Sequence, residues 1–266
     1  MTTRKALRFE KYGPPSILSI QQLQVPDLKP GQALVELHAS AINPSDVKNV
    51  AGVFKASLPR VPGRDYAGVV AGDGWKGKDV WGSGAGFGVS RDGTRAQYVV
   101  VSSDRLSEKP TRLSMEEASA IGVPYLAAWS GLVDAASIQV GETLLVTAAL
   151  GAVGRAATQI AHWKKAKVIG ADISEKSSDA DILINTKAKE LAVEVKTLTD
   201  GKGVELVFDA VGGPMFEPCL KSLRLGGRQV AIASIGDGRV KFRLIDFYHN
   251  LLRLIGVDTL KLTGPA

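Results

Sequence analysis

Hydrophobic and polar positions follow two different patterns in the two parts of the chain. From residue 7 to about residue 101, apolar residues come in short alternating runs, such as 33–39 and 67–71, separated by Gly, Pro, Asn and Asp. Alternation with a period of two buries one side of a strand, and the interrupting residues favour turns. This part therefore predicts an all-β, barrel-like domain.

The pattern changes after Pro110. Ser114 is followed three residues later by Glu117, a spacing typical of a capping box, and we expect a helix from there through Ala120. The domain boundary is expected shortly after this helix, with a first domain of residues 1–123 and a second of residues 124–258.

Beyond residue 142, short apolar runs alternate with helical segments. Continuous apolar runs are typical of parallel strands covered on both faces by helices, and predict a Rossmann-type doubly wound sheet and an α/β fold class. Strands are expected at 144–147, 167–170, 182–184, 204–208, 229–233 and 254–257, with helices ending at Trp163 and covering 189–198 and 216–223.

Composition and charge narrow the class of protein. The 266 residues are 45% hydrophobic and 23% charged, enough to bury a sizeable core. The net charge of +6 is spread along the chain without basic clusters interleaved with aromatics, so nucleic acid is not an expected partner. No apolar run has secretory or membrane-spanning length, and the single Cys219 cannot form an intrachain disulfide. We therefore expect a cytoplasmic protein without a membrane partner.

A candidate cofactor loop, Ala-Ala-Leu-Gly-Ala-Val-Gly at 148–154, joins the strand at 144–147 to a helix. Small residues let the backbone approach a pyrophosphate, and N–H groups at the helix start can bind its charge. Asp172 ends the next strand, where a carboxylate that binds ribose hydroxyls is expected. The alternative is a tight turn in another kind of α/β domain, with Asp172 as an ordinary cap.

Asp172 also favours NAD(H) over NADP(H), because a carboxylate repels a 2'-phosphate. At ~4 Å and an effective dielectric constant near 20, two unit charges interact by about 4 kcal/mol. Arg155 and Lys176 could offset part of this repulsion.

The chain resembles the medium-chain dehydrogenase/reductase superfamily in features that follow one another in the expected order. These are the β-rich first half, the segments Asn-Pro-Ser-Asp at 43–46 and Val-Pro-Gly-Arg-Asp-Tyr-Ala-Gly at 61–68, and the turn at 148–154. The resemblance implies a GroES-like β-barrel domain before the Rossmann domain. Alcohol dehydrogenases of this superfamily hold a catalytic zinc, but Asn43 and Arg64 stand at the first two ligand positions and Tyr125 lies near the third. One cysteine also excludes a four-cysteine structural zinc lobe, so we expect no metal.

The resemblance is to the zinc-less quinone oxidoreductases, also described as zinc-type alcohol dehydrogenase-like. It implies an NAD(P)H-dependent enzyme that transfers hydride to a quinone or an α,β-unsaturated carbonyl. Asn43 and Ser45 would orient the nicotinamide ribose and the substrate carbonyl, with Tyr66 or Tyr125 as an apolar wall and donor. Asn-Pro and Ser-Asp are also ordinary turn sequences, and Arg64 and Asp65 could simply pair with each other. The implied cofactor-binding residues are Asn43, Ala149, Leu150, Gly151, Ala152, Val153, Asp172, Lys176, Ala210, Val211, Ala233 and Ser234.

Several features depart from the pattern of these relatives. Ala148 replaces a glycine, the segment 174–181 is too short for the usual helix, and residues 259–266 begin a return to the first domain that is cut short. The shortened end leaves open a nucleotide-binding protein with little or no turnover, and an enoyl-thioester reductase is a further alternative. Relatives often pair through the edge that corresponds to 242–259, so a homodimer is compatible with the sequence.

Overall fold

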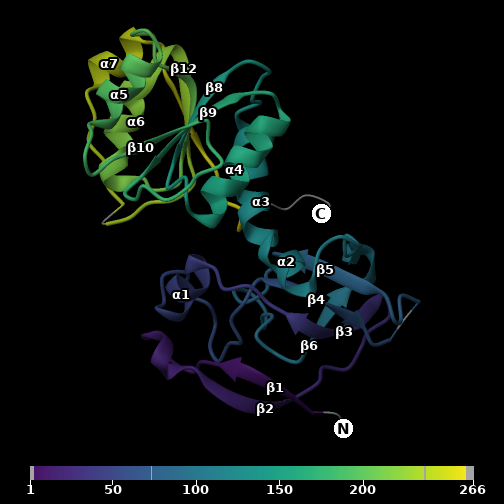
Figure 1. Ribbon diagram of the computed structural model, residues 1–266. Coiled ribbons are helices and arrows are strands. Elements are labelled where there is room, and N and C mark those ends of the chain that lie inside the picture. Colours follow the sequence, from purple (N-terminus) through teal and green to yellow (C-terminus); the bar gives the residue numbers. More distant parts are fainter. Residues whose placement is uncertain (1–2, 73, 237, 262–266) are drawn as a thin grey trace. The chain divides into compact units, whose positions relative to one another are not determined.

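The computed structural model describes residues 3–72, 74–236 and 238–261 (Figure 1). The chain forms two compact units, here termed the first unit, up to Val123, and the second unit, from Pro124 onward. Most of the predicted return segment at 259–266 lies outside the described residues. Within the described residues, no helix combines the length and the apolar character that a membrane crossing requires.

The first unit is built mainly of antiparallel strands, as the alternating pattern predicts. One sheet has the order β6-β3-β4-β5-β7, and β1 and β2 form a separate ribbon. Buried Ala33 and Val35 alternate with more exposed residues and pack in one core with Val99 and Tyr66. The elements are β1 (Thr3–Arg8), β2 (Ser19–Gln24), β3 (Gln32–Ala39), α1 (Pro44–Val50), β4 (Asp65–Val70), β5 (Asp79–Ser83), β6 (Tyr98–Ser102), β7 (Ser107–Glu108) and α2 (Met115–Ala120), with short 3-10 turns at Pro15–Ile17 and Ser103–Arg105.

Helix α2 confirms the predicted capping box. The Ser114 hydroxyl accepts the N–H of Glu117 at 3.1 Å, and the Glu117 carboxylate accepts the N–H of Ser114 at 2.8 Å. Helix α1, which the strand pattern does not predict, begins in a similar way, because the Asp46 carboxylate accepts the N–H of Asn43 at 2.9 Å and Pro44 occupies the first turn.

The second unit contains a six-stranded parallel sheet in the order β10-β9-β8-β11-β12-β13, which confirms the predicted doubly wound fold. The order reverses between β8 and β11, so this is the switch point at whose carboxyl ends such sheets bind ligands. The elements are α3 (Gly122–Trp129), the π-helical turn η3 (Ser130–Ala135), β8 (Thr143–Thr147), α4 (Ala152–Trp163), β9 (Lys167–Asp172), β10 (Ile182–Asn185), α5 (Leu191–Leu198), β11 (Val204–Asp209), η4 (Gly213–Met215), α6 (Phe216–Ser222), β12 (Leu223–Ala231), α7 (Leu244–His249) and β13 (Arg253–Gly256).

Helices cover both faces of this sheet (Figure 1). Ala157 and Ala161 of α4 pack with Leu132 of η3 in one core, whereas α5 and α6 form another. Cys219 of α6 is fully buried there, as expected of a small core residue, and burial raises the pKa of its thiol well above the usual value.

Two details of the sheet bear on the site. No helix lies between β9 and β10, which confirms the interpretation of segment 174–181. Strand β12 ends at Ala231 rather than at the predicted residue 233, because its partner β11 ends at Asp209 and turns away there, with Gly212 at φ +63°.

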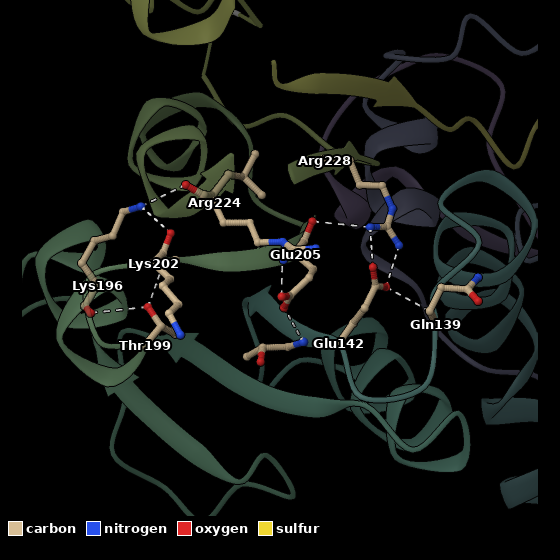
Figure 2. Close-up of polar contacts among 11 residues, drawn as sticks. Gln139, Glu142, Lys196, Thr199, Lys202, Glu205, Arg224 and Arg228 are labelled. Atoms are coloured by element: carbon tan, nitrogen blue, oxygen red, sulfur yellow. Dashed lines mark hydrogen bonds and ion pairs between the residues drawn. The ribbon is translucent and has the colours of Figure 1, made fainter. Parts of the chain in front are cut away.

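A polar network joins β8, β11 and β12 near the amino ends of β8 and β11 (Figure 2). Arg228 donates two hydrogen bonds to the Glu142 carboxylate, at 2.7 and 2.8 Å, and a third to the carbonyl of Ala136. Glu205 accepts the N–H of Thr143 at 2.8 Å. Although burial opposes it, the bonds from Arg228 hold the pKa of Glu142 below its usual value.

Candidate cofactor and substrate site

The loop before α4 has the geometry of an anion-binding helix start. Gly151 precedes the helix in an extended conformation, and the N–H groups of Ala149, Leu150 and Gly151 are bonded within the protein. Among the described residues, we find no acceptor for the N–H groups of Ala152 and Val153. Free N–H groups in a first helical turn attract negative charge. Of the five predicted loop residues, these two are therefore best able to bind a pyrophosphate.

The loop is also packed too tightly for larger side chains. A Cβ at Gly154 would lie 2.2 Å from the carbonyl oxygen of Ala148, so only glycine lets the helix approach the loop this closely. Ala148, in place of a glycine, has φ +50°, a left-handed conformation that costs an alanine about 1 kcal/mol or more. A tight loop that ends in free N–H groups fits a dinucleotide.

Asp172 lies at the carboxyl end of β9, beside this loop. Its Oδ2 accepts the N–H of Leu150 at 3.1 Å, and its Oδ1 accepts that of Ile173 at 2.8 Å. Because each carboxylate oxygen has two lone pairs, both oxygens retain capacity for a ligand hydroxyl. The half-buried side chain is thus held in place with acceptors to spare.

The two nearby cations differ in their freedom. Arg155 forms an ion pair with Asp179 at 3.7 Å and donates to the carbonyl of Leu150 at 3.2 Å. Lys176 is exposed. The charge of Arg155 is therefore partly neutralised by Asp179, and less of it is available to a 2'-phosphate.

The predicted nicotinamide-facing segments lie at the ends of β11 and β12 and are bonded to one another. The N–H of Ile235 donates to the carbonyl of Val211 at 3.1 Å, and the N–H of Ala210 donates to the hydroxyl of Thr147 at 2.9 Å. Ala233 and Ser234 occupy the segment just beyond β12. The resemblance implies that the strand end at 209–212 faces the nicotinamide, but the sequence does not predict that Asp209 is bonded there to Thr147 and Gln229.

In the first unit, the structure brings Asn43 and Ser45 together at the start of α1. The amide nitrogen of Asn43 donates to Asp65 at 2.7 Å, and the hydroxyl of Ser45 accepts from Arg64 at 3.3 Å. Arg64 and Asp65 are thus bonded to these two residues instead of to each other.

Asp65 is the centre of this cluster. It is fully buried and also accepts the hydroxyl of Ser83 and the N–H of Val123, the latter at 3.1 Å. Burial raises the pKa of Asp65, and the hydrogen bonds from Ser83 and Asn43 oppose that increase. The cluster therefore fixes Asn43 through one of its two amide N–H groups, and leaves Ser45 half-buried with its hydroxyl hydrogen free to donate.

The two predicted tyrosines lie in different units. Tyr66 of β4 is 2% exposed and packs edge-on against Phe87, and burial raises its pKa to about 12. This is a core position, so the expectation that Tyr66 lines the substrate site finds no support. Tyr125 of α3 donates its hydroxyl to Gln159, and burial, with the charge of Asp179, raises its pKa.

No group of three or more His, Cys, Asp and Glu residues that could hold a metal ion occurs among residues 3–72, 74–236 and 238–261.

Comparisons with known proteins identify the family. Residues 29–111 match the alcohol dehydrogenase GroES-like domain, and residues 152–262 match the zinc-binding dehydrogenase model. A zinc-type alcohol dehydrogenase-like protein of Schizosaccharomyces pombe is 35% identical over 97% of this chain and 80% of its own length. The quinone oxidoreductase of Homo sapiens is 28% identical over 87% of this chain and 74% of its length.

Solved structures agree with the sequence matches. An alcohol dehydrogenase superfamily protein from Novosphingobium aromaticivorans superposes with a TM-score of 0.86 at 32% identity, and covers all of this chain and 83% of its own. An NAD-dependent alcohol dehydrogenase gives a TM-score of 0.88 at 32% identity, over 96% and 84% of the two chains. The chain belongs to the quinone oxidoreductase-like proteins of the medium-chain dehydrogenase/reductase superfamily.

Proposed function

We propose that this protein is an NAD(P)H-dependent oxidoreductase that reduces a quinone or an α,β-unsaturated carbonyl without zinc, and that it prefers NADH. The proposal rests on one observation at the carboxyl edge of the parallel sheet in the second unit. The free N–H groups of Ala152 and Val153 lie at the start of α4, and the N–H of Leu150, just before them, is bonded to Asp172. The names of the relatives, quinone oxidoreductase and alcohol dehydrogenase, support the reaction class.

Bound there, the reduced nicotinamide would supply a hydride. Balanced for a quinone, NAD(P)H, one proton and the quinone give NAD(P)⁺ and the hydroquinone. The proposal assigns Ala152 and Val153 to the pyrophosphate and Asp172 to the ribose hydroxyls. The remaining predicted residues, Ala149, Leu150, Gly151, Lys176, Ala210, Val211, Ala233 and Ser234, would line the path of the cofactor.

Ser45 is the residue of the first unit best suited to the substrate oxygen. Because Arg64 donates to its oxygen, the hydroxyl hydrogen of Ser45 can point to a developing oxyanion, which a fixed donor stabilises. Asn43, which Asp65 holds through one amide N–H, would offer its second amide N–H to a ligand. Zinc independence rests on residue type, because Asn43 and Arg64 replace the first two ligands and neither supplies a thiolate or an imidazole.

Two further parts of the proposal concern the setting of the enzyme. A homodimer through 242–259 is supported by the edge position of β13 and by exposed Leu244, Tyr248 and Leu251 nearby. Light scattering coupled to gel filtration would detect it, and a monomer at all concentrations would contradict it. The cytoplasm is proposed as the compartment because the single cysteine, Cys219, is a buried thiol.

The deciding experiment follows the oxidation of NADH and NADPH with a panel of quinones and enones, with and without a chelator. Turnover that survives the chelator and is faster with NADH is the expected result. Turnover that the chelator abolishes would overturn zinc independence. Binding of both nucleotides without consumption by any acceptor would favour a nucleotide-binding protein instead, and turnover confined to an enoyl thioester would change the substrate class.

A further inference from the structure

The carboxyl edge of the sheet contains a second buried carboxylate that the proposed function leaves unused. Asp209 is the last residue of β11 and Thr147 the last residue of β8, so the two residues end the strands on either side of the switch point. The hydroxyl of Thr147 donates to Oδ1 of Asp209 at 2.9 Å. A side chain at this place lies where a doubly wound sheet receives its ligand.

Asp209 organises the turn that follows it. Its Oδ1 also accepts the N–H groups of Val211 and Gly212, at 3.1 and 2.9 Å. The N–H of Ala210 donates to Thr147, so three successive N–H groups of the turn are fixed by these two side chains. Gly212 has φ +63°, and a Cβ there would lie 2.4 Å from the carbonyl oxygen of Ala233, so the turn is held directly against the end of the next strand.

The donors around Asp209 are all uncharged. Asp209 is 0% exposed, and its Oδ2 accepts the side-chain amide of Gln229 at 3.1 Å. None of the ion pairs formed by the described residues includes Asp209. The other end of the same strands shows the opposite arrangement, because Arg228 neutralises Glu142 there. A buried carboxylate without a cation acts at longer range than a paired one.

The amide of Gln229 is the donor to the second oxygen of Asp209. The side chain of Gln229 is fully buried, and its Nε2 donates to Asp209, whereas its Oε1 has no hydrogen-bond partner among the residues that the structure describes. The side chain therefore turns its donor toward Asp209, and its own amide oxygen is left unpaired in return.

We propose that Asp209 is a positioning residue of the nicotinamide site, which fixes the turn at 210–212 both directly and through Thr147 and favours the oxidised, positively charged cofactor by its own charge. The inference rests on the proposed function. For one unit charge in surroundings with an effective dielectric constant near 20, we expect a preference of roughly tenfold. The preference would ease the departure of a hydride from the bound cofactor.

The test is a comparison of dissociation constants for NAD⁺ and NADH, measured by calorimetry in the absence of any acceptor. Asp209→Asn keeps the size of the side chain. If the side-chain amide of Gln229 rotates, its unpaired oxygen can accept a hydrogen bond from the new Asn amide. We expect the ratio of Kd for NAD⁺ to Kd for NADH to rise about tenfold. Asp200→Asn, which removes an exposed charge from the turn after α5, is the matched control and should leave the ratio unchanged.

The positioning role is tested separately at Thr147. Thr147→Val removes the hydroxyl that joins Asp209 to Ala210 and should raise both dissociation constants three- to tenfold with their ratio unchanged, whereas Thr147→Ser should restore both. This pair also decides the positioning role if Asp209→Asn does not fold, as judged by circular dichroism.

An unchanged ratio in a folded Asp209→Asn variant would overturn the charge effect, and unchanged affinities in Thr147→Val would overturn the positioning role. Failure of the wild-type protein to bind either nucleotide would instead overturn the proposed function itself.

Discussion

Replacement of Asp172 by Asn is the most direct test of cofactor choice. The variant removes the charge but keeps an oxygen that can accept the N–H of Leu150, now bonded to Asp172 at 3.1 Å. Two unit charges at ~4 Å interact by about 4 kcal/mol at an effective dielectric constant of 20, and partial exposure of the side chain reduces this to about 2 kcal/mol. We therefore expect the ratio of kcat/KM for NADPH to that for NADH to rise about 20- to 30-fold.

The assay is initial-rate oxidation of each cofactor with one quinone held at a fixed concentration. Asp200→Asn, the same charge change on the turn after α5, should leave the ratio within twofold of the wild-type value. A second variant, Asp179→Asn, releases Arg155 from its 3.7 Å ion pair and should improve NADPH alone, by a few-fold. If Asp172→Asn shifts the ratio no more than Asp200→Asn does, Asp172 is not beside the ribose and the preference has another origin.

Four other predictions follow from single contacts. Ala148→Gly relieves the left-handed conformation and should raise the free energy of unfolding by about 0.5 kcal/mol. Gly154→Ala forces the helix away from the loop and should lower the free energy of unfolding by about 2 kcal/mol. Urea titrations would measure both changes. Arg228→Met leaves Glu142 unpaired and should cost about 3 kcal/mol, most of which Arg228→Met/Glu142→Leu recovers. The pKa of Glu142 in the folded protein is lowered, so the contribution of this pair to the free energy of unfolding should be complete above about pH 5 and lost as the pH falls below 4.5. Acid titrations of both variants would measure this loss. Ser45→Ala should reduce kcat 10- to 100-fold with little change in KM, and an unaltered kcat would remove Ser45 from the reaction.

The second unit could be predicted well because its local signals and its packing agree. The apolar runs at β8, β9 and β11 are buried on both faces, so the periodicity that the sequence displays is the one that the core requires. The place of Asp172 at the carboxyl end of β9 could be predicted for a similar reason, because the end of an apolar run marks the end of the strand.

Other features escaped prediction for physical reasons. Helix α1 is only seven residues long and too short for a clear period, although Asn43, Pro44 and Asp46 form a readable helix start. Tyr66 carries a motif that suggested a wall of the site, but its position on β4 turns the ring toward Phe87, and one residue of shift along a strand decides between core and surface. The bonds between Thr147, Asp209 and Gln229 join residues 62 and 20 positions apart, and only the assembled sheet brings them together.

The two edges of the parallel sheet differ in how their charged side chains are bonded. Next to the amino end of β8, Glu142 and Arg228 of β12 satisfy each other, so this pair holds strands together and its charges neutralise one another (Figure 2). At the carboxyl ends, Asp172 keeps free lone pairs, and the donors bonded to Asp209 are uncharged. Burial of a carboxylate without a cation costs free energy. The proposed nicotinamide role would give that cost a function at Asp209, because the carboxylate would attract the positively charged oxidised cofactor, and the ratio of dissociation constants in Asp209→Asn decides whether it does.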